Sequence, residues 1–352
     1  MSRFLQLHLL TFYPPSNVNR DDTGNPKTAT MGGVTRLRIS SQALKRAWRT
    51  SEIFSSALAG HMGQRTQRLG GEIQRHLLEK GLDEKRSLEI ARAIAGIYGK
   101  IKAEKDGNPT YTEQLVFISP DERDAALAMA DRMVEDEKID PAKEKDTLLQ
   151  RTDTAADIAM FGRMLASEPS YNREAAVQVA HAVTTHRVTI EDDYYTAIDD
   201  LKRPDEDAGA GFLAEAGFGS GVFYLYLSVN RDLLRRNLGT AAASGVMPAA
   251  LGALAEAAAT VAPSGKQNSF AALTRAQYVL AERGNAQPRT LAGAFARPVA
   301  GPDLMAGSIA ALKEFRSELA RVYGPAGDAE CELEIGRKDT ATLADIVTFC
   351  RS

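Results

Sequence analysis

The sequence predicts an α+β fold, in which a small antiparallel sheet carries a large helical insertion and one long hairpin. Segments in which apolar and polar residues alternate lie near both ends of the chain, and the stretch between them has helical periodicity. Two of the strands are joined by about 30 residues rather than by a tight turn. Without these insertions the order is strand, helix, strand, strand, helix, strand. This is the ferredoxin-like order of RNA-recognition modules, so we expect an RRM-like core.

The first strand is expected in residues 3–12, where Leu5, Leu7 and Leu9 alternate with Gln6 and His8. This alternation predicts one buried face and one more polar face. A polar loop over residues 13–35 and a strand near 34–39 follow. The later strands are expected at residues 181–190, 221–229 and 276–281.

Helical segments separate these strands. Residues 56–178 place apolar residues three and four apart among dense charge, as in SLEIARAIAGIYGKIKAEK, and predict several helices. An alanine-rich helix is expected within residues 241–262 and a final helix near residues 308–323. The excursion over residues 191–220 holds nine acidic and two basic residues, a net charge of −7, and predicts a protruding hairpin.

Residues 19–49 form a basic segment within a chain whose formal net charge is −3. Seven basic residues stand against Asp21 and Asp22 in this segment, which gives a net charge of +5. A helix is expected after Ser40 or Ser41, either of which can cap its first turn. The spacing i, i+3, i+4, i+7 places four of its residues on one face: Gln42, Lys45, Arg46 and Arg49. Such a face is often only solvated, but together with a basic loop it favours a polyanion site.

Composition narrows the class of protein. The 352 residues are 44% hydrophobic and 25% charged, which is ordinary for a globular protein. Two cysteines, Cys331 and Cys350, are too few for a disulfide framework or a cysteine zinc site. We find no signal peptide and no apolar run long enough to span a membrane, so we expect a cytoplasmic protein without membrane contact.

Several motifs in a common order resemble the backbone (CasC-type) subunit of the type I-E CRISPR Cascade complex. The resemblance extends from residue 1 to about residue 320. It rests on NRDD at 19–22, GG at 32–33, RISSQALKRA at 38–47, DIAMFGRM at 157–164, HAVTTHRV at 181–188, DDYYTAIDDL at 192–201, SGVFY at 220–224 and PSGKQNSFAA at 263–272.

The resemblance implies a non-catalytic protein that needs no cofactor or metal. Subunits of this family bind the guide RNA (crRNA), polymerise head to tail along it beside other Cascade subunits, and hold it for pairing with one strand of target DNA. It also implies a hand-like architecture. The palm would comprise residues 1–55 and 178–352, the helical fingers residues 56–177, and the thumb residues 190–220.

The resemblance further implies individual site residues. The family's guide-contacting positions match Arg20, Lys27, Ser40, Gln42, Lys45, Arg46, Arg49, Arg163, Met164 and Lys266. The intercalating residues of the thumb match Tyr194, Tyr195, Ile198 and Leu213. Two departures stand out: Val34 occupies a loop position where relatives can carry a base, and residues 203–207 look like a small insertion in the thumb.

Two other functions remain open at this point. Asp21 and Asp22 are adjacent acids in a loop beside the expected RNA, and such a pair could bind magnesium in a metal-dependent RNA endonuclease. The simpler expectation is a structural role, such as pairing with the loop's own cations. A general single-stranded RNA-binding protein would also need the basic loop and helix.

Overall fold

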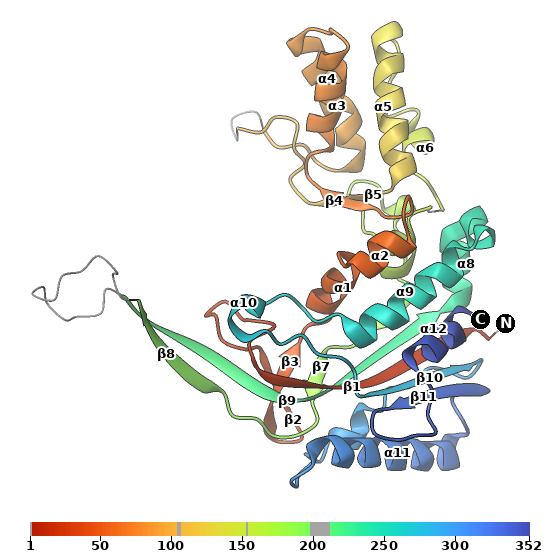
Figure 1. Ribbon diagram of the computed structural model, residues 1–352. Coiled ribbons are helices and arrows are strands. Elements are labelled where there is room, and N and C mark those ends of the chain that lie inside the picture. The colour runs from red at the N-terminus through yellow and green to blue at the C-terminus, as the bar shows by residue number, and fades with distance from the viewer. Residues whose placement is uncertain (1, 104–106, 153, 198–211) are drawn as a thin grey trace, which may run out of the picture.

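The computed structural model describes residues 2–103, 107–152, 154–197 and 212–352. It has a mixed α+β architecture, with helices packed on an antiparallel sheet. In Figure 1 a group of helices projects from one end of the sheet, and a long arm leaves its side. Ile198 of the expected thumb, and residues 203–207, lie outside the described residues.

The main sheet is built from strands that are distant in sequence. Its path is β11-β10-β1-β9-β7-β3-β2, with β6 and β8 also paired to β9. The strands are β1 (Phe4–Ser16), β2 (Thr28–Met31), β3 (Val34–Ile39), β6 (Val177–Val179), β7 (Ala182–Thr184), β8 (Glu191–Ala197), β9 (Phe212–Asn230), β10 (Tyr278–Gly284) and β11 (Ala329–Glu334). All pairs are antiparallel, and the central register sets Leu7 opposite Leu227 on one side and Ala281 on the other.

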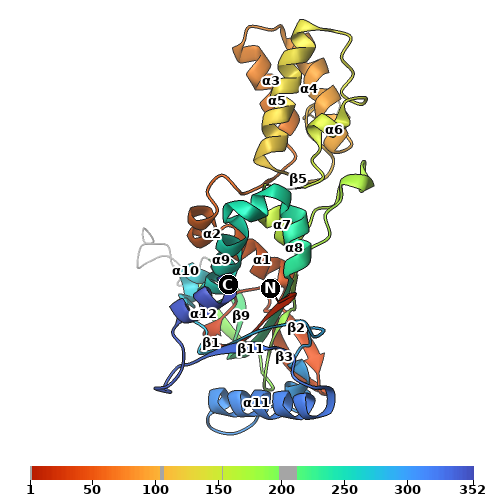
Figure 2. The same ribbon diagram turned by 90° about the vertical axis from the view of Figure 1, so that its right-hand side faces the viewer.

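One face of the sheet carries the larger hydrophobic core. Leu5, Leu7 and Leu9 of β1 pack there together with alternate residues of β9, as their spacing predicts. Helices from four separate parts of the chain cover this face (Figure 2). They are α1 (Ser41–Arg49), α2 (Glu52–Ala57), α7 (Ala156–Phe161), α8 (Arg231–Leu238), α9 (Val246–Thr260) and α12 (Leu343–Arg351), with the short helices η3 (Gly239–Ser244) and α10 (Gln267–Phe270) nearby.

The opposite face is covered as well, by α11 (Leu304–Tyr323) and η4 (Ala292–Phe295). Gln6 and His8 of β1 therefore lie on a polar face that is buried. Their polar atoms find partners there: the Tyr224 hydroxyl is 2.8 Å from His8 Nδ1, and the Tyr226 hydroxyl donates to Gln6 Oε1 over 2.8 Å. The sheet thus lies between two layers of helices (Figure 1).

The helical projection, defined here as the elements from β4 to α6, has a core of its own. Its two longest helices begin at side-chain caps: the Asp83 side chain accepts from Arg86 N, and Ser119 forms a capping box with Glu122. A two-stranded antiparallel sheet of β4 and β5 lies at its base (Figure 1). The elements are β4 (Gln64–Thr66), α3 (Leu69–Glu79), α4 (Glu84–Tyr98), β5 (Val116–Ile118), α5 (Pro120–Glu135) and α6 (Lys145–Leu148), and the short helix η2 (Pro169–Tyr171) follows.

Some expected boundaries differ in the structure. The loop expected over residues 13–35 contains the end of β1 and all of β2, which forms a hairpin with β3. Gly32 and Gly33 make its turn with positive φ angles of 60° and 76°, a conformation typical of two-residue hairpins. The C-terminal region, for which the sequence predicts no element, adds β11 and α12.

Among the described residues, no single helix combines the length and apolarity that crossing a membrane requires. The bent pair Arg231–Ser244 and Val246–Thr260 passes that test by length and composition only.

Candidate nucleic-acid interface

The basic helix α1 forms where local signals predict it. The Ser40 hydroxyl accepts a hydrogen bond from Ala43 N over 3.3 Å, which satisfies an otherwise unpaired amide of the first turn. Leu44 and Trp48 are buried in the larger core. Gln42 and Arg46 lie on the opposite, exposed side, so the cationic face points away from the core.

Two arginines of the basic segment form hydrogen bonds with groups inside the fold. Arg36 is completely buried, and its guanidinium donates to the carbonyl oxygens of Thr184 over 3.0 Å and Phe295 over 2.9 Å. Arg49 donates to the Asp157 carboxylate over 3.3 Å. The charge of +5 counted along the sequence is therefore larger than the charge that reaches the surface.

The loop over residues 17–27 is tied to its neighbours by asparagine side chains. Asn17 Nδ2 donates to Gly24 O over 2.9 Å and to Gly217 O, at the root of the arm, over 2.8 Å. Asn19 Oδ1 accepts from Ser40 N over 2.8 Å, which joins the loop to the start of α1. Arg20 is exposed on this loop, and Lys27 follows at its end. The hydrogen bond between Asn19 and Ser40 thus holds the expected basic loop against the start of the basic helix.

Asp21 organises this loop from within. Its Oδ1 accepts from Thr23 N over 2.9 Å, the Thr23 hydroxyl over 2.7 Å and Asn25 N over 3.0 Å. These hydrogen bonds, that of the Thr23 hydroxyl first, lower the pKa of Asp21. Its partners are amide and hydroxyl groups of the loop rather than the cations expected from the sequence. Within the described residues, no group of three or more His, Cys, Asp or Glu side chains could hold a metal ion.

Lys266 lies on a second loop close to the arm. The residue adopts a left-handed conformation with φ of 50°, which is uncommon outside glycine. It directly precedes α10, whose Phe270 contacts Phe218 of β9 at a ring distance of 5.9 Å. Lys266 is therefore presented near the root of the arm.

The GRM segment (residues 162–164) holds two residues that are expected to contact RNA, and their surroundings differ. The Arg163 guanidinium is buried and pairs with the buried Glu122 carboxylate over 2.5 Å. Because this charge is neutralised in the interior, the structure corrects the expectation that Arg163 contacts RNA. Met164 is 76% exposed and lines a hollow of about 290 Å³ with Leu115.

The arm consists of β8 paired with the first part of β9. Tyr194 pairs with Glu215, and the neighbouring Tyr195 with Ala214. Successive residues of a strand point to opposite faces, and these two tyrosines are 67% and 44% exposed. Leu213 is placed only by its backbone pairing with Thr196.

Sequence reasoning missed Arg65, which lies beside the cationic face of α1. Its guanidinium is 4.7 Å from the ring centre of Phe117, the residue opposite it in the β4–β5 sheet. The Arg49 guanidinium is 5.0 Å from the same ring. The proximity of Arg65 to α1 depends on long-range packing, so no local signal in the sequence could have indicated it.

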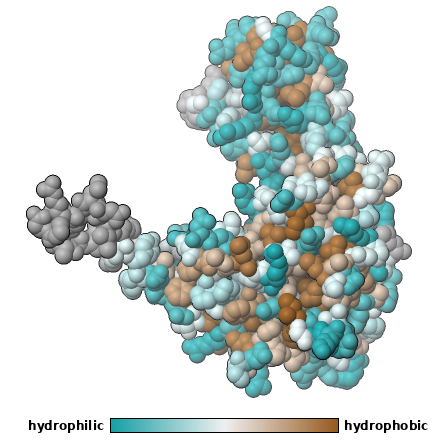
Figure 3. All heavy atoms as spheres, viewed as in Figure 1, coloured by the Kyte–Doolittle hydropathy of each residue, from teal (hydrophilic) through white to brown (hydrophobic). Residues whose placement is uncertain are grey.

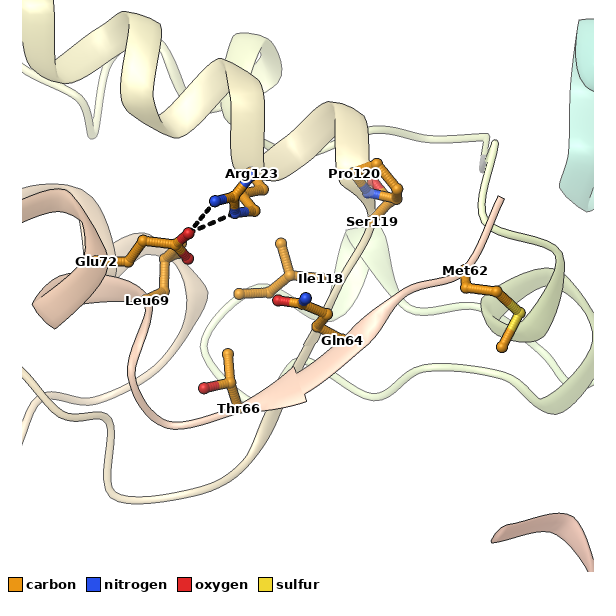
Figure 4. Close-up of a pocket in the computed structure, with 9 residues that line it drawn as sticks. All are labelled: Met62, Gln64, Thr66, Leu69, Glu72, Ile118, Ser119, Pro120 and Arg123. Atoms are coloured by element: carbon orange, nitrogen blue, oxygen red, sulfur yellow. Dashed lines mark hydrogen bonds and ion pairs between the residues drawn. The ribbon is translucent and has the colours of Figure 1, made fainter. Parts of the chain in front are cut away.

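The other side of β4 faces a small pocket of about 120 Å³ in the helical projection. Figure 4 shows Gln64 and Thr66 along β4, with the ion pair between Arg123 and Glu72 at the far side. The pocket and the Arg65 side chain use opposite faces of the strand, so the pocket is separate from the cationic surface.

The basic residues described above come from three neighbouring parts of the fold. Figure 3 shows a hollow between the helical projection and the arm. The exposed or partly exposed cations Arg20, Lys27, Lys45, Arg46 and Arg65 are carried by the loop, α1 and β4. Their chemistry suits an extended polyanion better than a small molecule.

Comparisons with known proteins agree with this geometry. The profile of the family described as CT1975-like protein matches residues 5–348. A chain of a structure described as "CRISPR RNA-guided surveillance complex, pre-nicking" is similar with 31% identity and a TM-score of 0.85, covering 99% of this chain and 100% of that chain. A chain of another "CRISPR RNA-guided surveillance complex" has 27% identity and a TM-score of 0.72, covering 97% and 94%. No curated protein matches significantly.

These findings confirm the resemblance to a CRISPR backbone subunit that the sequence motifs indicate. The narrower type I-E assignment stays a prediction. Because the family profile covers almost the whole described fold, the chain belongs to the CT1975-like protein family.

Proposed function

We propose that this chain is a non-catalytic backbone subunit that binds crRNA. In this proposal, copies of the chain polymerise head to tail along the crRNA next to other subunits of a type I-E complex. The bound guide is then presented for pairing with one strand of target DNA, so the protein need not read base edges.

The observation that carries the proposal is the set of exposed or partly exposed cations on a loop and a helix that are tied together. Arg20 and Lys27 on the loop join Lys45 and Arg46 on α1, and Asn17 links the same loop to the arm. Ser40 and Gln42 neighbour these cations in sequence, and Gly265, next to Lys266, packs against Val18 of the same loop. Lysine and arginine neutralise phosphates whatever the base, which is what a protein that holds any guide sequence requires.

The architecture supports the hand-like division. The order β10-β1-β9-β7, with α1 and α9 on one face, is the order expected of a ferredoxin-like palm and supports this assignment. We assign residues 1–55 and 178–352 to the palm, 56–177 to the fingers and 190–220 to the thumb. Exposed Tyr194 and Tyr195 on the thumb, and Met164 near the fingers, would contact bases by stacking or wedging.

Binding of labelled single-stranded RNA at increasing salt tests the proposal. We expect the logarithm of the binding constant to fall linearly with the logarithm of salt, by about 0.7 for each neutralised phosphate. Lys45→Ala with Arg46→Ala should lower both the affinity and this slope. Arg321→Ala on α11, an exposed arginine paired with Glu318, is the matched control and should change neither.

Gel filtration with RNAs of two lengths tests polymerisation. The complex should grow with RNA length, because head-to-tail contacts do not close. A chain that stays monomeric with RNA at low salt would contradict the proposal. Sequencing the co-purified nucleic acid separates this function from general single-strand binding, which predicts no common guide species. Magnesium-dependent cleavage that is lost in Asp21→Asn would favour the endonuclease alternative instead.

A further inference from the structure

Four cations from two parts of the fold meet where the helical projection joins the sheet. Lys45, Arg46 and Arg49 come from α1, and Arg65 comes from β4 of the projection. Arg49 and Arg65 both stack near Phe117, at 5.0 Å and 4.7 Å from its ring centre. An aromatic ring attracts cations through its negative faces, so Phe117 holds two guanidiniums close together despite their like charge.

Among the described residues, one carboxylate lies in this cluster, and both of its oxygens already accept hydrogen bonds. Asp157 Oδ1 accepts from Gly63 N over 2.7 Å and from Ile158 N over 3.0 Å. Asp157 Oδ2 accepts from Arg49 over 3.3 Å, and Arg49 also donates to Gly63 O over 3.4 Å. Asp157 therefore positions Arg49 against the start of β4, next to Arg65.

The cluster carries a surplus of positive charge. Four cations and one carboxylate give a net charge of +3. In the described part of the chain, no ion pair to a carboxylate is formed by Lys45, Arg46 or Arg65. Partial burial, followed by the charge of Arg65, lowers the pKa of Lys45. Burial, then the charges of Arg49 and Arg46, lowers the pKa of Arg65, although Asp157 opposes this. The cluster thus repels itself, and a bound anion would relieve that repulsion.

We propose that Arg65, supplied by the helical projection, is a further contact residue for the phosphate backbone of single-stranded RNA, beside Lys45 and Arg46 of α1, with Arg49 as a positioning residue behind them. This site rests on the proposed RNA-binding function and extends the RNA-binding surface from α1 to β4 of the helical projection. A phosphate that contacts both α1 and β4 fastens the projection to the sheet. Binding of RNA and the position of the projection are therefore coupled.

The contribution of Arg65 is tested by salt titrations of RNA binding. In Arg65→Ala we expect the slope to fall by about 0.7 and the affinity by roughly 3- to 10-fold. Arg65→Lys keeps the charge but loses the planar stack on Phe117, so its slope should match the wild type with an intermediate affinity. Arg321→Ala again serves as the exposed control. Circular dichroism verifies that each variant is folded.

The coupling is tested by amide hydrogen exchange with and without RNA. We expect RNA to slow exchange in β4 and β5 of the wild type but much less in Arg65→Ala. Wild-type RNA binding with an unchanged slope and unchanged protection in Arg65→Ala would overturn this inference and leave the proposed function intact. Absence of RNA binding by the wild type would overturn the proposed function itself.

Discussion

Arg36 and Arg46 lie in one basic segment, but their side chains have different surroundings. Arg36 is on β3, pointing into the layer between the sheet and η4, and burial lowers its pKa. Arg46 is exposed on α1, in the last turn, where a cation also suits the negative end of the helix dipole. The direction in which each side chain points determines whether its charge stabilises the fold or is available to a ligand, since Arg49, on the same helix as Arg46, also pairs inside the fold.

We therefore expect opposite effects from substituting these two arginines. Arg36→Met leaves the carbonyl oxygens of Met31, Thr184 and Phe295 without this donor, and should lower the free energy of unfolding by about 1–3 kcal/mol. Arg46→Ala should change it by less than about 0.5 kcal/mol. Urea unfolding measures both changes in the free energy of unfolding. RNA titration of the folded variants should show the loss of affinity in Arg46→Ala. A loss of RNA affinity confined to Arg36→Met would contradict this division.

At the scale of elements, the sequence predicts α1 well because its signals are local. Ser40 caps the helix, and the spacing of Leu44 and Trp48 sets its buried side. The alternation in β1 likewise assigns Leu5, Leu7 and Leu9 to one face and the polar residues between them to the other. The partners of Arg163 and Arg65 could not be predicted, because Glu122 and Phe117 come close only through the packing of the helical projection.

The exposed tyrosines of the arm lead to a prediction at this scale. Tyr194 is exposed and lies on a strand outside the cores of the sheet, so Tyr194→Ala should leave the melting temperature unchanged. If the ring stacks on a base, its loss should weaken RNA binding by about 1–3 kcal/mol. Fluorescence anisotropy with single-stranded RNA measures this. Tyr323→Ala on α11 removes another exposed tyrosine, 80% accessible, and should have no effect. Equal affinities of the two variants would exclude a stacking role for Tyr194.

At the scale of the whole molecule, the helical layer of α11 and η4 buries a network of polar side chains against the sheet. His8 Nε2 lies 3.3 Å from Glu282, and Arg316 of α11 donates to the same carboxylate over 3.0 Å. Burial is the main cause that lowers the pKa of His8. Burial alone would raise the pKa of Glu282, but the contacts with His8, Arg316 and Arg289 outweigh it and lower the pKa to about 2. We regard His8 as neutral and Arg316 as the main partner of the charge.

This network predicts a loss of stability in acid. As pH falls below 6.5, the ordinary pKa of histidine, His8 takes up a proton in the unfolded chain but not in the folded chain. The free energy of unfolding should therefore decrease as the pH decreases. Glu282 adds a further loss below its ordinary value of 4.5, as pH falls toward about 2. Chemical denaturation from about pH 8 to 5 checks this, since His8→Gln should flatten the decline below pH 6.5. An identical decline in the variant would show that His8 does not contribute.

Strand β9 has one further consequence for the molecule. Its 19 residues run without a break from the arm to the centre of the sheet, a length of roughly 60 Å at about 3.3 Å per residue. At the root of the arm, a side chain at Gly217 or Gly219 would collide with Asn25 or Leu37, at 2.6 Å and 2.9 Å. The root of the arm is thus held by close packing against the loop of residues 17–27 and β3. If copies of the chain bind side by side along one RNA, each arm would reach the RNA at the same distance from its own subunit, so the arm contacts would recur at a fixed interval.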